Sequence, residues 1–258
     1  MKIHFLGTCA GTEPIAGVHH ASFTITVSDR VYWFDAGECC SYTAHLLGVD
    51  LLSVCKIVIS HTHMDHIGGL GNLLWNIRKL TYVKKQEPVF SDIDLYIPKL
   101  ESYRGLEMLL NNTEGGFQKN FNILPHKTED GVLFDDGFMR VTALHNSHRQ
   151  REEVDGEHLS FSFLIEAEGK KIVYTGDTGE YTDIDPLLCG RVDALIGETG
   201  HFTVEEVYDY TKDKEIDKMI FFHNNGVIVK DFEGAKQKVE KLFEGKAVIS
   251  YDGLCLDM

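Results

Sequence analysis

Apolar residues recur along the chain in short runs, either continuous or alternating with polar residues, and turn-forming residues bound each run. This pattern is typical of strands, while apolar residues three and four positions apart indicate helices between them. No linker or shift in composition divides the chain, so we predict one domain, 1–258, built from β-rich halves of about 1–130 and 131–258. Strands are expected at 2–6, 22–27, 31–34, 55–60, 93–97, 138–144, 159–166, 171–175, 193–196, 218–222 and 247–250, and helices at 41–48, 68–80, 103–112, 204–211 and 232–243.

Two segments lack such a pattern. Residues 7–14 are rich in small side chains, which favours a close approach of the backbone to another part of the molecule. Residues 111–130 have little periodicity and contain Gly115-Gly116, so we interpret them as a lid or a simple excursion. His19 and His20 precede a predicted hairpin, and we interpret both as structural.

A group of three histidines and an aspartate directly follows strand 55–60 and reads His61-Thr62-His63-Met64-Asp65-His66. Imidazole and carboxylate are both ligands for zinc. If the segment is a loop, its side chains have no fixed directions, and Asp65 and His66 can face one ion while His61 and His63 face another. Four ligands exceed the three that one catalytic zinc usually takes from protein, which indicates two ions. The alternative is a solvated polar loop.

Further candidate ligands follow other expected strands. They are His145 and His148, Asp177, and His223. Strand ends meet at one rim of a sheet, so we expect these side chains to complete the metal site. Asp35, which also follows a strand, either orients a metal-bound histidine or caps a turn.

Composition narrows the function. The formal net charge of −15 disfavours a general nucleic-acid binder, because polyanions bind basic surfaces. The six cysteines are scattered without a CxxC pair, and the chain opens on a strand instead of a secretory signal; both features indicate a cytoplasmic protein with reduced thiols. No apolar run approaches the ~20 residues that span a bilayer, so no membrane partner is expected.

Taken together, the motifs resemble those of the metallo-β-lactamase superfamily along nearly the whole chain. Residues 61–66 match the HxHxDH signature, and Phe5-Leu6-Gly7-Thr8 and Tyr251-Asp252-Gly253 resemble the ribonuclease Z-like branch. The resemblance implies an α/β fold, a four-layer αββα sandwich of two mixed sheets with helices on the outer faces. Three further segments resemble motifs of this superfamily. Phe34-Asp35-Ala36-Gly37 resembles the Asp motif that precedes the signature, Tyr174-Thr175-Gly176-Asp177-Thr178 resembles the bridging-Asp motif, and Phe222-His223 resembles the last metal histidine.

The resemblance also implies two sets of metal ligands. One ion would be held by His61, His63 and His148, the other by Asp65, His66 and His223, and Asp177 would bridge them. We prefer His148 because the ligand of this branch typically follows a strand valine by seven positions, as His148 follows Val141; His145 is the alternative. The cofactors implied are two divalent metal ions, with zinc preferred and manganese or iron as alternatives.

Two more motifs resemble the ribonuclease Z-like pattern. Gly197-Glu198-Thr199 resembles its strand-end Glu motif, and His201-Phe202-Thr203 resembles its His-Ser-Thr motif. In that branch the Glu orients the His, which protonates the leaving group. This chain departs from the pattern because only two residues separate Glu198 from His201 and Phe202 replaces the usual Ser.

The implied reaction is hydrolysis by a hydroxide that bridges the two ions, with Asp65 orienting the nucleophile and His201 protonating the leaving oxygen. Asp177 stands where a B1-type lactamase uses Cys, and flavin-linked diiron members carry an acidic residue at the position of His63. Both differences favour a phosphodiesterase. Ribonuclease Z enzymes of the usual kind insert a Gly-rich tRNA-gripping arm before the bridging Asp, whereas 149–176 leave room only for a loop and two strands. We therefore predict a small or nucleotide-like phosphodiester substrate and disfavour tRNA.

Three alternatives stay open. The chain is also compatible with an RNA-processing endonuclease of ribonuclease Z type without the arm, with a thioester or lactone hydrolase, and with a non-catalytic metal-binding sensor. If the protein is an oligomer, we expect a dimer. Substrate selectivity is expected to come from residues 111–130 and 149–158.

Overall fold

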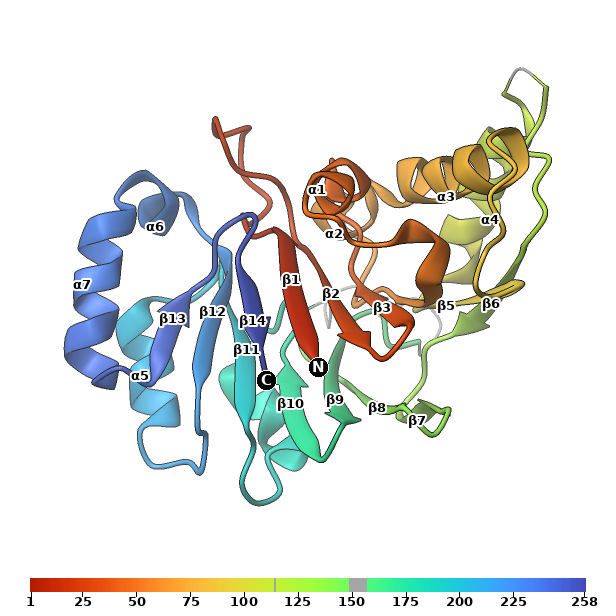
Figure 1. The fold of residues 1–258 in the computed structure, drawn as a ribbon. Coiled ribbons are helices and arrows are strands. Elements are labelled where there is room, and N and C mark those ends of the chain that lie inside the picture. The colour runs from red at the N-terminus through yellow and green to blue at the C-terminus, as the bar shows by residue number, and fades with distance from the viewer. Residues whose placement is uncertain (114, 149–156) are drawn as a thin grey trace. The chain divides into compact units, whose positions relative to one another are not determined.

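The computed structural model describes residues 1–113, 115–148 and 157–258, and these form two compact units, each with its own seven-stranded sheet (Figure 1). Unit 1 comprises Met1–Gly7, His19–Thr128 and Asp252–Met258, and unit 2 comprises Thr8–Val18 and Glu129–Tyr251. Both sheets mix parallel and antiparallel strands, so the expected α/β class with two mixed sheets is confirmed. That the two units make one domain stays a prediction.

The sheet of unit 1 begins with antiparallel strands and continues with parallel ones. Pairing is antiparallel from β14 to β3 and parallel from β3 to β6. The carboxyl ends of β3 and β4 therefore lie at one edge, and Asp35 and the 61–66 segment follow them. In sheet order the strands are β14 (Cys255–Asp257), β1 (Lys2–Gly7), β2 (Ser22–Val27), β3 (Arg30–Phe34), β4 (Val54–Val58), β5 (Asp92–Ile97) and β6 (Asn122–Lys127).

Helices of unit 1 share a core with this sheet. Along α3, the side chains of Leu70, Leu73, Leu74 and Ile77 are at most 1% exposed, and they pack in one cluster with Trp33 of β3. Burying each of these side chains stabilises the folded state by about 1.5–3 kcal/mol. Their burial therefore holds α3 against the sheet and fixes where it begins after the histidine-rich segment. The helical elements are α1 (Cys40–Leu46), η1 (Leu51–Ser53), α2 (Met64–Ile67), α3 (Leu70–Arg78), the π-helical turn η2 (Lys79–Val83) and α4 (Leu100–Asn111).

The sheet of unit 2 has the same mixture in a different chain order. Its strands are antiparallel from β7 to β10 and parallel from β10 to β13. The carboxyl ends of β10, β11 and β12 therefore share one edge, which is where open α/β sheets commonly bind ligands. In sheet order the strands are β13 (Ala247–Ile249), β12 (Met219–Asn224), β11 (Ala194–Thr199), β10 (Lys170–Tyr174), β9 (Phe161–Ala167), β8 (Met139–His145) and β7 (Gly131–Asp135).

A second helix-and-sheet core stabilises unit 2. Val204 and Val207 of α5 and Val239 of α7 pack in one cluster with Val173 and Phe221 of the sheet. The start of α5 is capped because the Thr203 hydroxyl accepts a hydrogen bond from the backbone N–H of Glu206, three residues into the helix. The helical elements are η4 (Tyr181–Leu187), α5 (Val204–Thr211), α6 (Gly226–Lys230) and α7 (Phe232–Phe243).

Several elements differ from the expectation. The 111–130 segment is neither wholly a lid nor a plain excursion, because Asn122–Lys127 forms β6 at the edge of its sheet. This strand is mostly exposed and contains Pro125, so it lacks the alternation that marks a half-buried strand. Strands β7 and β14, the elements η4 and α6, and the first turn of α4 were also not expected. Residues 149–156, in which part of the substrate selectivity was predicted, lie outside the described residues.

In the part of the chain that the structure describes, no helix is long and apolar enough to cross a membrane. The longest helices there, α4 and α7, have 12 residues each.

Candidate metal centre

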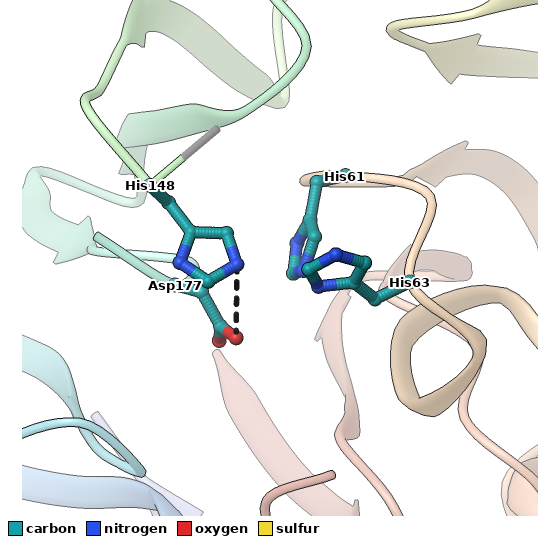
Figure 2. A group of neighbouring side chains, drawn as sticks. All are labelled: His61, His63, His148 and Asp177. Carbon is teal, nitrogen blue, oxygen red and sulfur yellow. Dashed lines mark hydrogen bonds and ion pairs between the residues drawn. The ribbon is translucent and has the colours of Figure 1, made fainter. Parts of the chain in front are cut away.

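Two ring nitrogens meet in the turn that follows β4. His61 is fully buried, and its Nε2 lies 2.9 Å from Nδ1 of His63. The two rings meet edge to face, with centroids 4.6 Å apart (Figure 2). The hydroxyl of Ser60 is 3.1 Å from Nδ1 of His61, which leaves Nε2 directed at His63. This pair offers two nitrogen donors to one ion.

A second donor pair forms at the start of α2. Nε2 of His66 lies 3.4 Å from Oδ2 of Asp65. The expectation of a loop throughout 61–66 was wrong here, because Met64–Ile67 form a helical turn with His63 as its N-cap residue. The turn gives both side chains fixed directions. The segment thus contains two donor pairs, and the rings of His61 and His66, one from each pair, have centroids 4.1 Å apart.

Asp35 holds the 61–66 segment in place through contacts with Ser60 and His66. Its Oδ1 accepts a hydrogen bond from the backbone N–H of Ser60 at 2.6 Å, and its Oδ2 accepts one from the Ser60 hydroxyl at 2.8 Å. Oδ2 also lies 2.8 Å from Nδ1 of His66, and the side chains of Asp35 and His66 are both fully buried. Asp35 therefore orients His66, and metal-ligating histidines commonly have such a partner on their other nitrogen.

His19 has a structural role in the same unit. Its backbone N–H and its ring Nδ1 both contact Oδ2 of Asp252, at 2.7 and 3.0 Å. The contact ties the start of β2 to the segment before β14. This agrees with the structural interpretation of His19.

In unit 2, Asp177 presents its two oxygens to two different histidines. Oδ2 lies 3.8 Å from Nε2 of His148, the contact drawn as a dashed line in Figure 2. Oδ1 lies 3.2 Å from Nδ1 of His223. Asp177 and His223 are 2–3% exposed and His148 is 11% exposed. His145, the alternative to His148, instead contacts Asp130, with Nδ1 2.7 Å from Oδ2.

The turns that carry His148 and Asp177 share an anchor that the sequence analysis missed. Oδ2 of Asp183 accepts hydrogen bonds from the backbone N–H and hydroxyl of Ser147, at 2.9 and 2.6 Å, and from the Thr178 hydroxyl at 2.8 Å. Burial favours the neutral form of Asp183, but these hydrogen bonds outweigh it and lower the pKa of the carboxyl group. No pattern in the sequence identified Asp183, because its partner Ser147 lies 36 residues away.

Glu198 and His201 do form a pair, despite their short spacing. Nδ1 of His201 lies 2.9 and 3.0 Å from the two carboxylate oxygens of Glu198. Glu198 is fully buried and also accepts a hydrogen bond from the backbone N–H of Thr178. The hydrogen bond that Glu198 accepts from Nδ1 raises the pKa of His201, whose side chain is 46% exposed. Phe202, which replaces the usual Ser, packs its ring against Tyr181.

Two close backbone approaches fix His223. A Cβ on Gly200 would lie 2.5 Å from Nδ1 of His223, so the ring occupies space that only glycine leaves open. The next residue, Asn224, donates its backbone N–H to the carbonyl of Thr8 and accepts the backbone N–H of Ala10. The small-residue loop of 7–14 therefore approaches the end of β12, which agrees with the close approach expected from its sequence.

The donors in each unit fit divalent transition-metal ions. All are imidazole nitrogens or carboxylate oxygens, which suit zinc, manganese and iron. Unit 1 supplies the pairs His61/His63 and Asp65/His66. Unit 2 supplies His148 and His223, each beside a different oxygen of Asp177.

Comparison with known proteins agrees with this chemistry. Residues 1–193 match the family model described as Anti-Pycsar protein Apyc1. The ribonuclease Z of Listeria innocua is 26% identical over 254 residues, a match that covers 93% of this chain and 79% of that enzyme. The share of a relative that is covered varies, and the chain spans only 45% of the ribonuclease Z of Methanothermobacter thermautotrophicus, which is 28% identical over 149 residues.

Solved structures show the same fold. The short form of human tRNase Z (ELAC1) superposes with a TM-score of 0.75 at 22% identity, covering 100% of this chain and 99% of that one. The metallo-β-lactamase fold protein YhfI from Bacillus subtilis gives 0.73 at 19% identity, covering 99% and 98%. The expected resemblance is thereby confirmed. The chain belongs to the Anti-Pycsar protein Apyc1 family and is a metal-dependent hydrolase of the metallo-β-lactamase superfamily, in its ribonuclease Z-like branch.

Proposed function

We propose that the protein is a binuclear phosphodiesterase that hydrolyses a small or nucleotide-like phosphodiester. The observation that carries the proposal is the placement of Asp177, whose two oxygens lie beside different histidines. A carboxylate so placed suits a bridge between two ions. The ligands of the first ion are His61, His63, His148 and Asp177, and those of the second are Asp65, His66, His223 and Asp177.

Two divalent ions at such a centre lower the pKa of a shared water and neutralise the charge of the phosphate oxygens. Zinc is the preferred metal because of the imidazole-rich donor set. Asp65 would hold the second ion and would accept a hydrogen bond from the attacking water, orienting the lone pair of that water toward phosphorus.

His201 is the proposed proton donor to the leaving oxygen. Its Nδ1 contacts Glu198, so Nε2 is the nitrogen that can deliver a proton. Glu198 raises the pKa of His201 and so keeps more of the ring protonated near neutral pH. Its ring centroid lies 5.0 Å from that of His148 and 6.0 Å from that of His223, which places the donor beside two proposed ligands.

Two features support this substrate class: the short segment between His148 and Asp177, and the net charge of the protein. Between His148 and Asp177 the sequence has room for a loop and the strands β9 and β10, and not for an arm that grips tRNA. The net charge of −15 also disfavours a large polyanion.

One alternative has an observation in its favour. The Listeria enzyme named ribonuclease Z matches over 93% of this chain, which supports an RNA-processing endonuclease without the arm. Cleavage of a 3′-extended precursor tRNA at rates comparable to those for small phosphodiesters would establish this second function.

The test is a substrate panel assayed with zinc-, manganese- and iron-loaded protein. The panel contains bis(p-nitrophenyl) phosphate, a dinucleotide, nucleoside cyclic monophosphates, a precursor tRNA, a thioester and a lactone. We expect turnover of small phosphodiesters, loss of turnover and of metal in Asp177→Ala, and neither loss in Asp94→Ala, whose carboxylate pairs with the exposed His126. Full activity of Asp177→Ala or of metal-free protein would overturn the proposal. Turnover of only the thioester or the lactone would show that the protein hydrolyses these substrates instead of phosphodiesters. Metal binding without any turnover would indicate a sensor.

A further inference from the structure

A second group of metal-binding side chains lies within unit 2, apart from the residues of the proposed centre. It consists of Asp130, His145 and His158, and one ligand atom from each lies within 4.8 Å of the others. Asp130 directly precedes β7, His145 ends β8, and His158 lies shortly before β9. Three separate stretches of chain thus converge on one point at the surface.

The contacts hold these side chains in a defined arrangement. The backbone N–H of His145 donates to Oδ1 of Asp130 at 2.7 Å, which leaves Oδ2 to face the His145 ring. That ring stacks on the ring of His158, with centroids 3.7 Å apart and an angle of 14° between the planes.

We propose that Asp130, His145 and His158 bind a third divalent transition-metal ion of the zinc class. Two histidines and one carboxylate are an established ligand set for zinc and for iron, with water in the remaining positions. Oδ2 of Asp130 and Nδ1 of His145 are 2.7 Å apart, and a tetrahedral ion would separate them to roughly 3.3 Å. Their side chains are 40–43% exposed, so a small rotation provides this space. The hydrogen bond from the His145 backbone to Oδ1 keeps the carboxylate oriented toward the ion.

The position of the third site gives it a consequence for the proposed centre. His145 and His158 flank in sequence the stretch that carries His148. An ion bound to His145 would reduce the freedom of His148, three residues further along the chain. We therefore assign the third ion a positioning role and no contact with substrate.

The experiment counts zinc equivalents by equilibrium dialysis and elemental analysis over a range of free zinc concentrations. Wild-type protein is expected to bind one equivalent more than His158→Ala and one more than Asp130→Asn. The matched control is His126→Ala, which removes another exposed histidine with an aspartate 2.7 Å away, and it should bind as many equivalents as wild type. Equal zinc binding by wild type, His158→Ala and Asp130→Asn would overturn the proposal. The three side chains would then be an ordinary surface cluster held by hydrogen bonds and ring stacking.

A background variant separates this site from the proposed function. In Asp177→Ala, which is expected to lose the binuclear centre, the third equivalent should persist and should disappear on adding His158→Ala. A ring-nitrogen NMR spectrum of protein labelled in its 13 histidines gives an independent readout. Zinc should shift two ring signals together in the third binding step, and these shifts should be absent in His158→Ala. A third equivalent that binds without these two shifts would place the ion elsewhere and refute the assignment.

Discussion

Replacing Asp35 by Asn tests how the protein presents His66 to a metal ion. The carboxylate accepts hydrogen bonds from the Ser60 N–H and hydroxyl and faces Nδ1 of His66. The asparagine amide has one oxygen and one NH₂ group, so one of these donors must meet another donor. The Ser60 N–H cannot change, whereas His66 can move its proton from Nδ1 to Nε2. We therefore expect the amide oxygen to take the Oδ1 position, where it accepts the Ser60 N–H. The NH₂ group then takes the Oδ2 position, where it faces Nδ1 of His66 and the Ser60 hydroxyl, and the hydroxyl can rotate to accept.

The tautomer shift has a direct cost for metal binding. Nε2 of His66 faces Oδ2 of Asp65 at 3.4 Å, on the side where the second ion is proposed, and a proton there removes the lone pair that would bind the ion. If the proton returns to Nδ1 so that Nε2 can bind the ion, the Nδ1–H of His66 again faces the NH₂ group of the asparagine. This contact between two donors costs about 1–3 kcal/mol for a buried group. At about 1.4 kcal/mol per tenfold, this corresponds to a roughly 5–140-fold loss of affinity. Loss of the partner of a metal-bound histidine has effects of similar size, about 10–100-fold.

The assay is a competition between protein and a chelator for zinc, together with urea unfolding of the metal-free protein. Asp35→Asn should weaken the second binding step and lower turnover in parallel, with a stability loss of only about 1 kcal/mol because each hydrogen bond keeps a partner. Asp94→Asn, which changes a carboxylate beside the exposed His126, is the matched control and should bind zinc as wild type does. Wild-type affinity for both ions in Asp35→Asn would refute the tautomer argument.

Three further changes test other parts of the site. Gly200→Ala places a methyl group 2.5 Å from Nδ1 of His223 and should weaken one zinc-binding step by about tenfold or more, measured by the same competition; unchanged affinity would show that the ring can move aside. Glu198→Gln removes the main cause of the raised pKa of His201, so the alkaline limb of the pH–rate profile should move to lower pH, and a limb that stays in place would exclude His201 as the proton donor. Asp183 has a pKa below its ordinary value of 3.8, so it stabilises the folded state above that value and loses this effect as the pH falls through the lowered pKa. Asp183→Asn should therefore reduce stability at neutral pH and flatten its acid dependence, which chemical denaturation at several pH values can check; an unchanged slope would contradict this role.

Most of the strands, and the candidate metal ligands that follow them, could be predicted from the sequence. Candidate ligands such as Asp177 and His223 were identifiable because each follows a run of apolar residues that forms a buried strand. Asp183 and Gly200 were not identifiable in this way. Their roles depend on contacts with Ser147 and with the His223 ring, which arise only when distant turns come together.

Edge strands and short helices were also beyond the reach of sequence patterns. Strand β6 has few buried positions, so burial leaves no alternation in its sequence. Helix α2 is one turn long, too short for a helical period to show. Its effect on the site is nevertheless large, because it sets the directions of Asp65 and His66.

The pairing of β14 with β1 bears on how the protein folds. Ile3 is opposite Leu256 in this pair, so two residues far apart in the sequence must meet before this sheet is complete. Unit 1 also contributes no residues between Gly7 and His19, because Thr8–Val18 belongs to unit 2. Neither unit is a continuous stretch that a ribosome could release and leave to fold by itself. Contacts of such long sequence separation slow folding, so we expect the edge of the first sheet to form late, after β14 has been synthesised.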